Sequence, residues 1–261
     1  CSSATNLTLR YGGRRDNYLT AFSSMPSIWA YAKNSIFRTV YIDGQSTGNN
    51  LQNGMTIDEF NEIDEFIQFD NTPVLNRDLA IASKLVELIN NNTREFIYVN
   101  KVGAHFPVND KYPDNYLIYE PVLERGKFAN LAHTGNKFDF RGTLDDWIRY
   151  RNSYRNTILW NVGEFFQKII SETRLKNTVI IYTSDHGQDL HEDGKPGLST
   201  HCSSDPNVEE GMVPIVVMQN TNVRSLDWEQ NLLKNYDHSS HYNIFPTILS
   251  LMMYNRDQIT P

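Results

Sequence analysis

Three short segments of this 261-residue chain place metal-binding or anion-binding residue types directly after apolar runs. They are Asp185 and His186 after TVIIYTS, Lys101 and His105 after FIYVN, and His201 a few residues beyond the first pair. A carboxylate oxygen beside an imidazole nitrogen is a common donor set for zinc or manganese. Gly187 permits the sharp turn that would let both side chains of the first pair reach one ion. The residue types therefore indicate a metal site, with an N-cap aspartate and a solvated histidine as the alternative.

Four apolar runs are expected to form the strands that position these residues. They lie at residues 39–43, 95–103, 178–185 and 213–219. Each run is continuous rather than alternating, which is typical of strands that are covered on both faces. Ligands of such sheets bind beyond the carboxyl ends of the strands, so the three polar segments are expected to meet at one edge.

Helical periodicity separates the strand candidates. Apolar residues recur at three- and four-residue spacing at 79–89 and 158–169, which gives each segment one apolar face. Shorter helices are expected at 25–34 and 241–254. The alternation predicts an α/β fold in which helices flank a doubly wound, mostly parallel sheet, within a single domain that spans residues 1–261.

Two polar stretches lie outside this alternation. Residues 107–150 are long, polar and aromatic, and we expect them to leave the sheet edge as a loop that covers a substrate site. The segment DHSSH at 237–241 precedes the last helix. We interpret it as a helix cap with a packed histidine, rather than a ligand set made of His238 and His241.

Composition excludes some functions. A net charge of -7 without a Lys/Arg cluster argues against nucleic-acid binding. No apolar run approaches the roughly 18 to 20 residues that cross a bilayer. The chain opens on Cys1 in a polar segment, so we expect upstream sequence to be missing. Its two cysteines, Cys1 and Cys202, fit either free thiols or a disulfide.

The segments YTSDHGQDL, GAHFP, STHCSSDP and SHYNIFPTIL resemble the alkaline-phosphatase-like sulfatase superfamily. Within it, they are most similar to the bacterial phosphoethanolamine transferases that modify lipid A or the lipopolysaccharide core. The opening CSSATNLTLRYGG resembles the family's nucleophile segment and places its threonine on Thr5. The family's preceding strand, which ends in an acidic metal ligand, has no counterpart because the sequence starts at Cys1.

The resemblance implies roles for individual residues. The catalytic residues are Thr5, His105 and His201; the metal ligands are Thr5, Asp185 and His186; the substrate-binding residues are Lys101, His105 and His201. The implied cofactor is zinc, with manganese or another divalent metal as the alternative. A helix that follows Thr5 would point its N-terminal N–H groups at the substrate phosphate.

The implied reaction has two steps. Thr5 takes phosphoethanolamine from phosphatidylethanolamine and passes it to a lipopolysaccharide sugar or sugar phosphate. The chain would then be the periplasmic domain of an inner-membrane protein, anchored through a missing N-terminal segment. Because Thr5 and His201 should meet at one site, the resemblance also makes a disulfide between Cys1 and Cys202 an expectation, and such a bond suits the periplasm.

Three other functions stay open. A sulfatase of the same fold would carry a C/S-x-P-x-R pattern, but Ser3 stands where proline should be and Thr5 where arginine should be. A phosphoglycerol transferase or phosphodiesterase of this fold also uses a threonine. A binding module that holds a phosphate or sugar without catalysis would need neither metal nor nucleophile.

Overall fold

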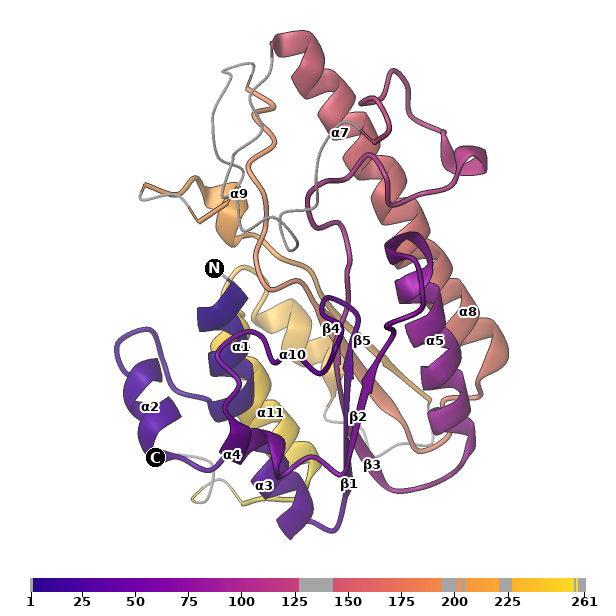
Figure 1. Ribbon diagram of the computed structural model, residues 1–261. Helices are drawn as coiled ribbons and strands as arrows, with labels where there is room; N and C mark the ends of the chain where they lie inside the picture. The colour runs from indigo at the N-terminus through magenta and orange to yellow at the C-terminus, as the bar shows by residue number, and fades with distance from the viewer. Residues whose placement is uncertain are drawn as a thin grey trace.

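A computed structural model describes residues 2–126, 143–193, 201–202, 205–220, 227–255 and 257 (Figure 1). The strands are β1 Arg38–Asp43, β2 Glu65–Gln68, β3 Glu95–Asn100, β4 Val179–Thr183 and β5 Ile215–Gln219. The α-helices are α1 Ser2–Tyr11, α2 Tyr18–Ser24, α3 Ile28–Asn34, α4 Ile57–Phe60, α5 Val74–Asn90, α7 Leu144–Ile158, α8 Phe165–Glu172, α9 Val208–Gly211, α10 Trp228–Lys234 and α11 Ile244–Leu251. Two 3₁₀ turns, η1 Asp114–Tyr116 and η3 His241–Asn243, and one π-helical turn, η2 Leu159–Glu164, complete the described elements.

A parallel sheet in the order β2-β1-β3 forms the centre of the molecule. The middle strand β1 pairs with both neighbours in register, so that Asp43 lies opposite Gln68 on one side and Asn100 on the other. Both amides donate to the Asp43 carboxylate at 2.9 Å, and this carboxylate is buried. The three parallel strands therefore end together in one hydrogen-bonded polar row.

Helices cover both faces of this sheet (Figure 1). Val40 and Ile42 of β1 pack with α5 and α8 on one face, whereas Tyr41 packs with α3 and α11 on the other. Complete burial of such a side chain contributes roughly 1.5–3 kcal/mol. Burial on both faces explains why β1 reads as one continuous apolar run. The predicted doubly wound α/β fold is confirmed.

Two features of the strands differ from the expectation. β4 and β5 pair antiparallel, as a second sheet of two strands. β2 was not predicted, because EFIQ is four residues long, half-buried throughout and flanked by acidic residues, so it lacks the apolar run of its neighbours. β3, β4 and β5 lie within the predicted ranges, and β1 begins one residue before its predicted range.

The helices largely match the periodicity. A helix begins at Leu144 and continues through η2 to Glu172, so the segment at 158–169 is helical as predicted. The prediction of a loop through residue 150 is wrong at its end, because Thr143 and Asp146 form a capping box that starts α7. The described part of the loop, residues 107–126, is irregular apart from η1 and packs against α7 through Val108 and Leu123. Residues 127–142 lie outside the described part of the chain.

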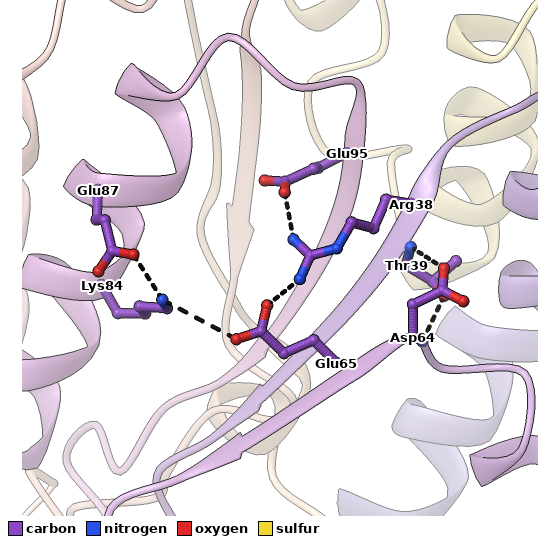
Figure 2. A network of polar contacts seen from close by, with 7 residues as sticks. All are labelled: Arg38, Thr39, Asp64, Glu65, Lys84, Glu87 and Glu95. Atoms are coloured by element: carbon purple, nitrogen blue, oxygen red, sulfur yellow. Dashed lines mark hydrogen bonds and ion pairs between the residues drawn. The ribbon is translucent and has the colours of Figure 1, made fainter.

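Charged residues join the amino ends of the parallel strands (Figure 2). Arg38 at the start of β1 contacts Glu65 of β2 and lies 2.6 Å from Glu95 of β3. Lys84 of α5 extends the network, at 4.0 Å from Glu65 and 2.8 Å from Glu87. Alternating charges of this kind hold three strand ends and one helix together at the surface.

Within the described residues, no helix has both the length and the apolar character needed to span a membrane.

Candidate active site

The first turn of α1 contacts the carboxyl end of β4, 180 residues further along the chain. Thr5 donates its hydroxyl hydrogen to the backbone oxygen of Asp185, at 2.8 Å. α1 is held in place by Tyr98 of β3, which donates to Asn6 at 2.8 Å. Burial raises the pKa of Tyr98 to about 12, so this phenol keeps its hydrogen. The predicted nucleophile therefore lies beside the predicted metal-binding pair.

Asp185 and His186 follow β4 and direct their side chains toward one another. Nε2 of His186 lies 3.7 Å from a carboxylate oxygen of Asp185. Nδ1 of His186 lies 2.8 Å from the backbone oxygen of Gly187, which can only accept, so this contact assigns the hydrogen to Nδ1. Nε2 is then the ring nitrogen that can bind a cation beside the carboxylate. Ligating histidines commonly donate their other N–H to a carbonyl in this way.

This donor pair fits a divalent cation. Two ligands of a tetrahedral zinc ion lie about 3.3 Å apart, which is close to the separation of the two atoms of Asp185 and His186. Among the described residues, no group of three or more His, Cys, Asp or Glu side chains is arranged to hold a metal. The third donor that the sequence predicts is the Thr5 hydroxyl, which is adjacent to the pair.

His201 and His105 lie close to this pair. The His201 ring stacks on the His186 ring, with centroids 4.2 Å apart and planes 10° from parallel. Burial, together with the neighbouring His186, lowers the pKa of His201. Burial and the nearby Lys111 lower the pKa of His105 to about 4, and His201 and Asp185 also lie near enough to act on this pKa electrostatically. Both imidazoles are thus neutral near pH 7.

Lys101, predicted to bind substrate, is directed elsewhere. Its ammonium lies 3.1 Å from a carboxylate oxygen of Asp78, donates to the backbone oxygen of Asn161 at 2.8 Å and lies over the Phe165 ring. Asp78 is fully buried and also accepts from the backbone N–H groups of residues 102 and 103, each at 2.8 Å. In this arrangement Lys101 fastens the loop that carries His105, and its role in substrate binding stays a prediction.

Sequence reasoning missed two residues that hold the same loop. Lys111 is 2% exposed and donates to the backbone oxygen of His105. Asn161 donates to the backbone oxygens of Gly103 at 3.2 Å and Lys111 at 3.1 Å. Asn161 lies in η2, a π-helical turn, and such turns often occur at functional sites. The only sequence signal was their position near GAHFP and within an apolar helix.

Gly187 fits tightly between the metal-binding pair and α9. Its N–H donates to the backbone oxygen of Glu210 at 2.9 Å. A Cβ atom at this position would lie 2.0 Å from the Glu209 oxygen and 2.6 Å from the Met212 oxygen. From the sequence, we expected a glycine here to allow a sharp turn of the backbone. In the structure, a glycine is needed because the backbone of α9 approaches too closely for a side chain.

His241 is a further residue at this strand end. Its Nε2 atom lies 2.7 Å from the backbone oxygen of Ser184. The predicted cap in DHSSH is present, because the Ser240 N–H donates to Asn243 at 2.9 Å. Packing of the histidine was also expected, but its polar contact with the strand was not.

Cys202 is disulfide-bonded. Cys1, the partner that the resemblance implies, lies outside the described residues, so the pairing stays a prediction.

Comparison with known proteins identifies similar chains. The sulfatase family model matches residues 15–254, a range that begins after Thr5. No curated protein sequence matches this chain.

Solved structures share the fold at low sequence identity. The C-terminal periplasmic domain of EcEptC from Escherichia coli, in complex with zinc, is 15% identical with a TM-score of 0.71, covering 100% of this chain and 70% of that one. The soluble domain of lipooligosaccharide phosphoethanolamine transferase A from Neisseria meningitidis is 18% identical, with a TM-score of 0.64 and coverage of 99% and 77%. The integral membrane form of that transferase is 17% identical, with a TM-score of 0.67 and coverage of 99% and 48%.

Proposed function

This chain belongs to the sulfatase family, and from that premise we propose that it is a metal-dependent phosphoethanolamine transferase. Thr5 accepts phosphoethanolamine from phosphatidylethanolamine and passes it to a sugar or sugar phosphate of lipopolysaccharide. The two Neisseria structures that share the fold support this substrate class, because both are described as a lipooligosaccharide phosphoethanolamine transferase.

The hydrogen bond from Thr5 to the backbone oxygen of Asp185 is the observation that carries the proposal. It brings a hydroxyl nucleophile, in the first turn of α1, next to the carboxylate and imidazole that fit a cation. The first N–H groups of a helix lack intrahelical partners and favour a phosphate. A phosphoryl group at Thr5 would therefore lie between these N–H groups and the Asp185-His186 pair.

The proposed first step exchanges one ester for another. The Thr5 oxygen forms a bond to phosphorus, the bond from phosphorus to the diacylglycerol oxygen breaks, and diacylglycerol leaves as an alcohol that carries the hydrogen of the Thr5 hydroxyl. His105 and His201, which are neutral near pH 7, can each donate an N–H to a phosphoryl oxygen or accept a proton. In the second step the acceptor oxygen attacks the same phosphorus and Thr5 regains its hydrogen.

A divalent metal, zinc in the first instance, would be held by Thr5, Asp185 and His186. When bound, it supplies a Lewis acid that favours the alkoxide form of the threonine and polarises a phosphoryl oxygen. The zinc complex of the Escherichia coli domain supports this choice of ion.

The proposed location is the periplasmic side of an inner membrane, with anchoring through a segment upstream of Cys1. The similarity of the fold to that of a periplasmic domain from Escherichia coli supports it. Both proposed substrates are lipids or lipid-linked sugars, so the site must work close to a membrane surface.

Intact-protein mass spectrometry tests the first step directly. After incubation with phosphatidylethanolamine vesicles and zinc, the 261-residue chain should gain the mass of one phosphoethanolamine group, located on Thr5 by peptide mapping. The Thr5→Ala variant should gain nothing. Thr8→Ala is the matched control, because Thr8 lies one turn further along α1 and its hydroxyl donates within the helix, to the backbone oxygen of Ala4 at 3.0 Å.

Other outcomes would assign the alternatives. A mass gain only from phosphatidylglycerol would indicate a phosphoglycerol transferase. Hydrolysis of an aryl sulfate or an aryl phosphodiester without a lasting mass gain would indicate a sulfatase or a phosphodiesterase. A chain that binds zinc or phosphate but neither gains mass nor hydrolyses these compounds would be a binding module, and the transferase proposal would be wrong.

A further inference from the structure

His241 connects the last helix to the carboxyl end of β4. It begins η3, directly before α11, and lies 57 residues from its partner in the chain. Nε2 of His241 is 2.7 Å from the backbone oxygen of Ser184 and 3.5 Å from the hydroxyl of Thr183. A carbonyl oxygen only accepts, so the hydrogen of this imidazole is on Nε2, opposite to the assignment for His186.

His241 and Thr5 hold consecutive peptide groups. His241 donates to the oxygen of Ser184, and Thr5 donates to the oxygen of Asp185. The two residues come from elements that pack against each other, since α1 contacts both η3 and α11. The backbone that leads from β4 into the metal-binding pair is therefore held from two separate segments of the chain.

The two hydrogen bonds differ during the proposed reaction. When the Thr5 oxygen carries a phosphoryl group, its hydrogen has left with diacylglycerol and it can no longer donate to Asp185. The bond from His241 involves no reacting atom and persists. The carboxylate of Asp185 must stay in place through the second step, while the phosphothreonine is attacked.

We propose that His241 is a positioning residue for the transfer reaction, which keeps the end of β4 and its metal-binding pair in place while Thr5 is phosphorylated. The inference rests on the proposed function. Its structural basis is the Nε2–H contact to Ser184, and its consequence lies in the rate of turnover rather than in donor binding. Residues that orient groups bound directly to a metal typically change activity about 10- to 100-fold when they are replaced.

Three variants test the proposal in the 261-residue chain with phosphatidylethanolamine vesicles and zinc. His241→Leu removes the donor and keeps similar bulk. His241→Gln places an amide N–H at nearly the reach of Nε2. His238→Leu is the matched control, because His238 is exposed in the same DHSSH segment.

The rates of formation and discharge of phosphothreonine, the KM for the donor and the unfolding temperature are measured for each variant. We expect His241→Leu to slow discharge about 10- to 100-fold with little change in KM, His241→Gln to recover most of the rate, and His238→Leu to match the parent. In the parent, ¹⁵N NMR of the imidazole should show the hydrogen of His241 on Nε2.

The outcomes separate the inference from the proposed function. A parent chain that forms no phosphothreonine overturns both. An active parent with unchanged rates in His241→Leu overturns the inference alone. Equal impairment of the Leu and Gln variants, or a hydrogen on Nδ1 of His241, also overturns it, because the imidazole would then contribute packing and not a hydrogen bond. If His241→Leu fails to fold, the Gln variant and the NMR assignment still decide.

Discussion

The two ends of the parallel sheet use charge in different ways. At the amino ends, Arg38 is 43% exposed and pairs with both Glu65 and Glu95 in a network of charged side chains (Figure 2). At the carboxyl ends, Asp43 and Asp78 are buried, and their carboxylates accept hydrogen bonds from side-chain amides and backbone N–H groups. Asp78 also pairs with Lys101. Exposed ion pairs contribute little each, whereas a buried charge is costly to separate from its partner.

The two ends therefore use polar side chains for different purposes. The amino-end network joins strands and a helix that apolar packing already holds together. At the carboxyl ends, Asp78 instead fixes the start of the loop of His105, through the backbone N–H groups of residues 102 and 103. Four substitutions would break or sharpen this contrast.

The largest effect is expected for Asp78→Asn. The change leaves Lys101 without its buried counterion and turns an amide toward backbone N–H groups that need an acceptor. We expect the free energy of unfolding to fall by about 3–5 kcal/mol, measured by urea denaturation. Glu87→Gln, in the amino-end network, should lose at most about 1 kcal/mol, because the Glu87 side chain is 58% exposed. Similar losses for both variants would remove the contrast between the two ends.

The next effect is expected for Gly187→Ala. The added methyl group would overlap the backbone oxygen of Glu209, so α9 or the strand end must move. Overpacking of this kind costs roughly 1–3 kcal/mol, and rigid backbone on both sides favours the upper end. Gly163→Ala is the control, since a Cβ atom there meets nothing within 4 Å. Thermal unfolding should show the control neutral or stabilised, and a tolerated Gly187→Ala would contradict the close approach.

A pH dependence is expected from Lys111. Burial lowers the pKa of this ammonium from 10.5 to about 7. Between these values the unfolded chain binds more protons than the folded chain, so stability rises with pH, by at most about 1.4 kcal/mol per unit. Below about pH 7 the group is protonated in both states and the slope ends.

Urea denaturation of Lys111→Met at several pH values from about 7 to 9 checks this slope. The variant should lose the rise that the parent shows. Lys168→Met should keep it, because Lys168 forms a surface pair with Glu172 at 2.7 Å. An unchanged slope in Lys111→Met would place the titrating group elsewhere.

The smallest effect is expected for Arg38→Gln. Because the Arg38 side chain is 43% exposed, loss of its pairs with Glu65 and Glu95 should lower the free energy of unfolding by about 1 kcal/mol or less, and this difference should shrink toward zero in about 1 M salt. Arg10→Met breaks the pair with Glu59, whose side chains are 1% and 0% exposed, and its larger loss should persist in salt. A salt-independent loss for Arg38→Gln would show that the network is not a surface feature.

The fold class was predictable because burial on both faces of a strand produces a continuous apolar run, as in β1. The family and the fold are confirmed, and the motifs carried the prediction of the family. β2 was not predicted, because a short, half-buried strand has no continuous apolar run. The antiparallel pairing of β5 could not be predicted, because strand direction depends on the connection and not on the apolar pattern.

The candidate site was predictable where chemistry and strand ends coincide. Asp185, His186 and His201 meet as expected, and Thr5 joins them across 180 residues through a resemblance that periodicity alone would not supply. Lys101 shows the limit of this reasoning. A lysine after a strand can turn toward a substrate or toward a buried acid such as Asp78, and only the packing of α5 decides between them.

The π-helical turn η2 limits how many residues the chain can lose or gain at 159–164. Its wider hydrogen-bond spacing accommodates one residue more than an α-helical turn. A chain with one residue fewer at 159–164 could form an unbroken α-helix, but the side chains beyond it would rotate by about 100° relative to those before it. Either Asn161 would then leave the loop of His105 or Phe165 would leave the core under the sheet. In relatives that keep this site, the types of residue in the turn should therefore vary more than the number of residues in it.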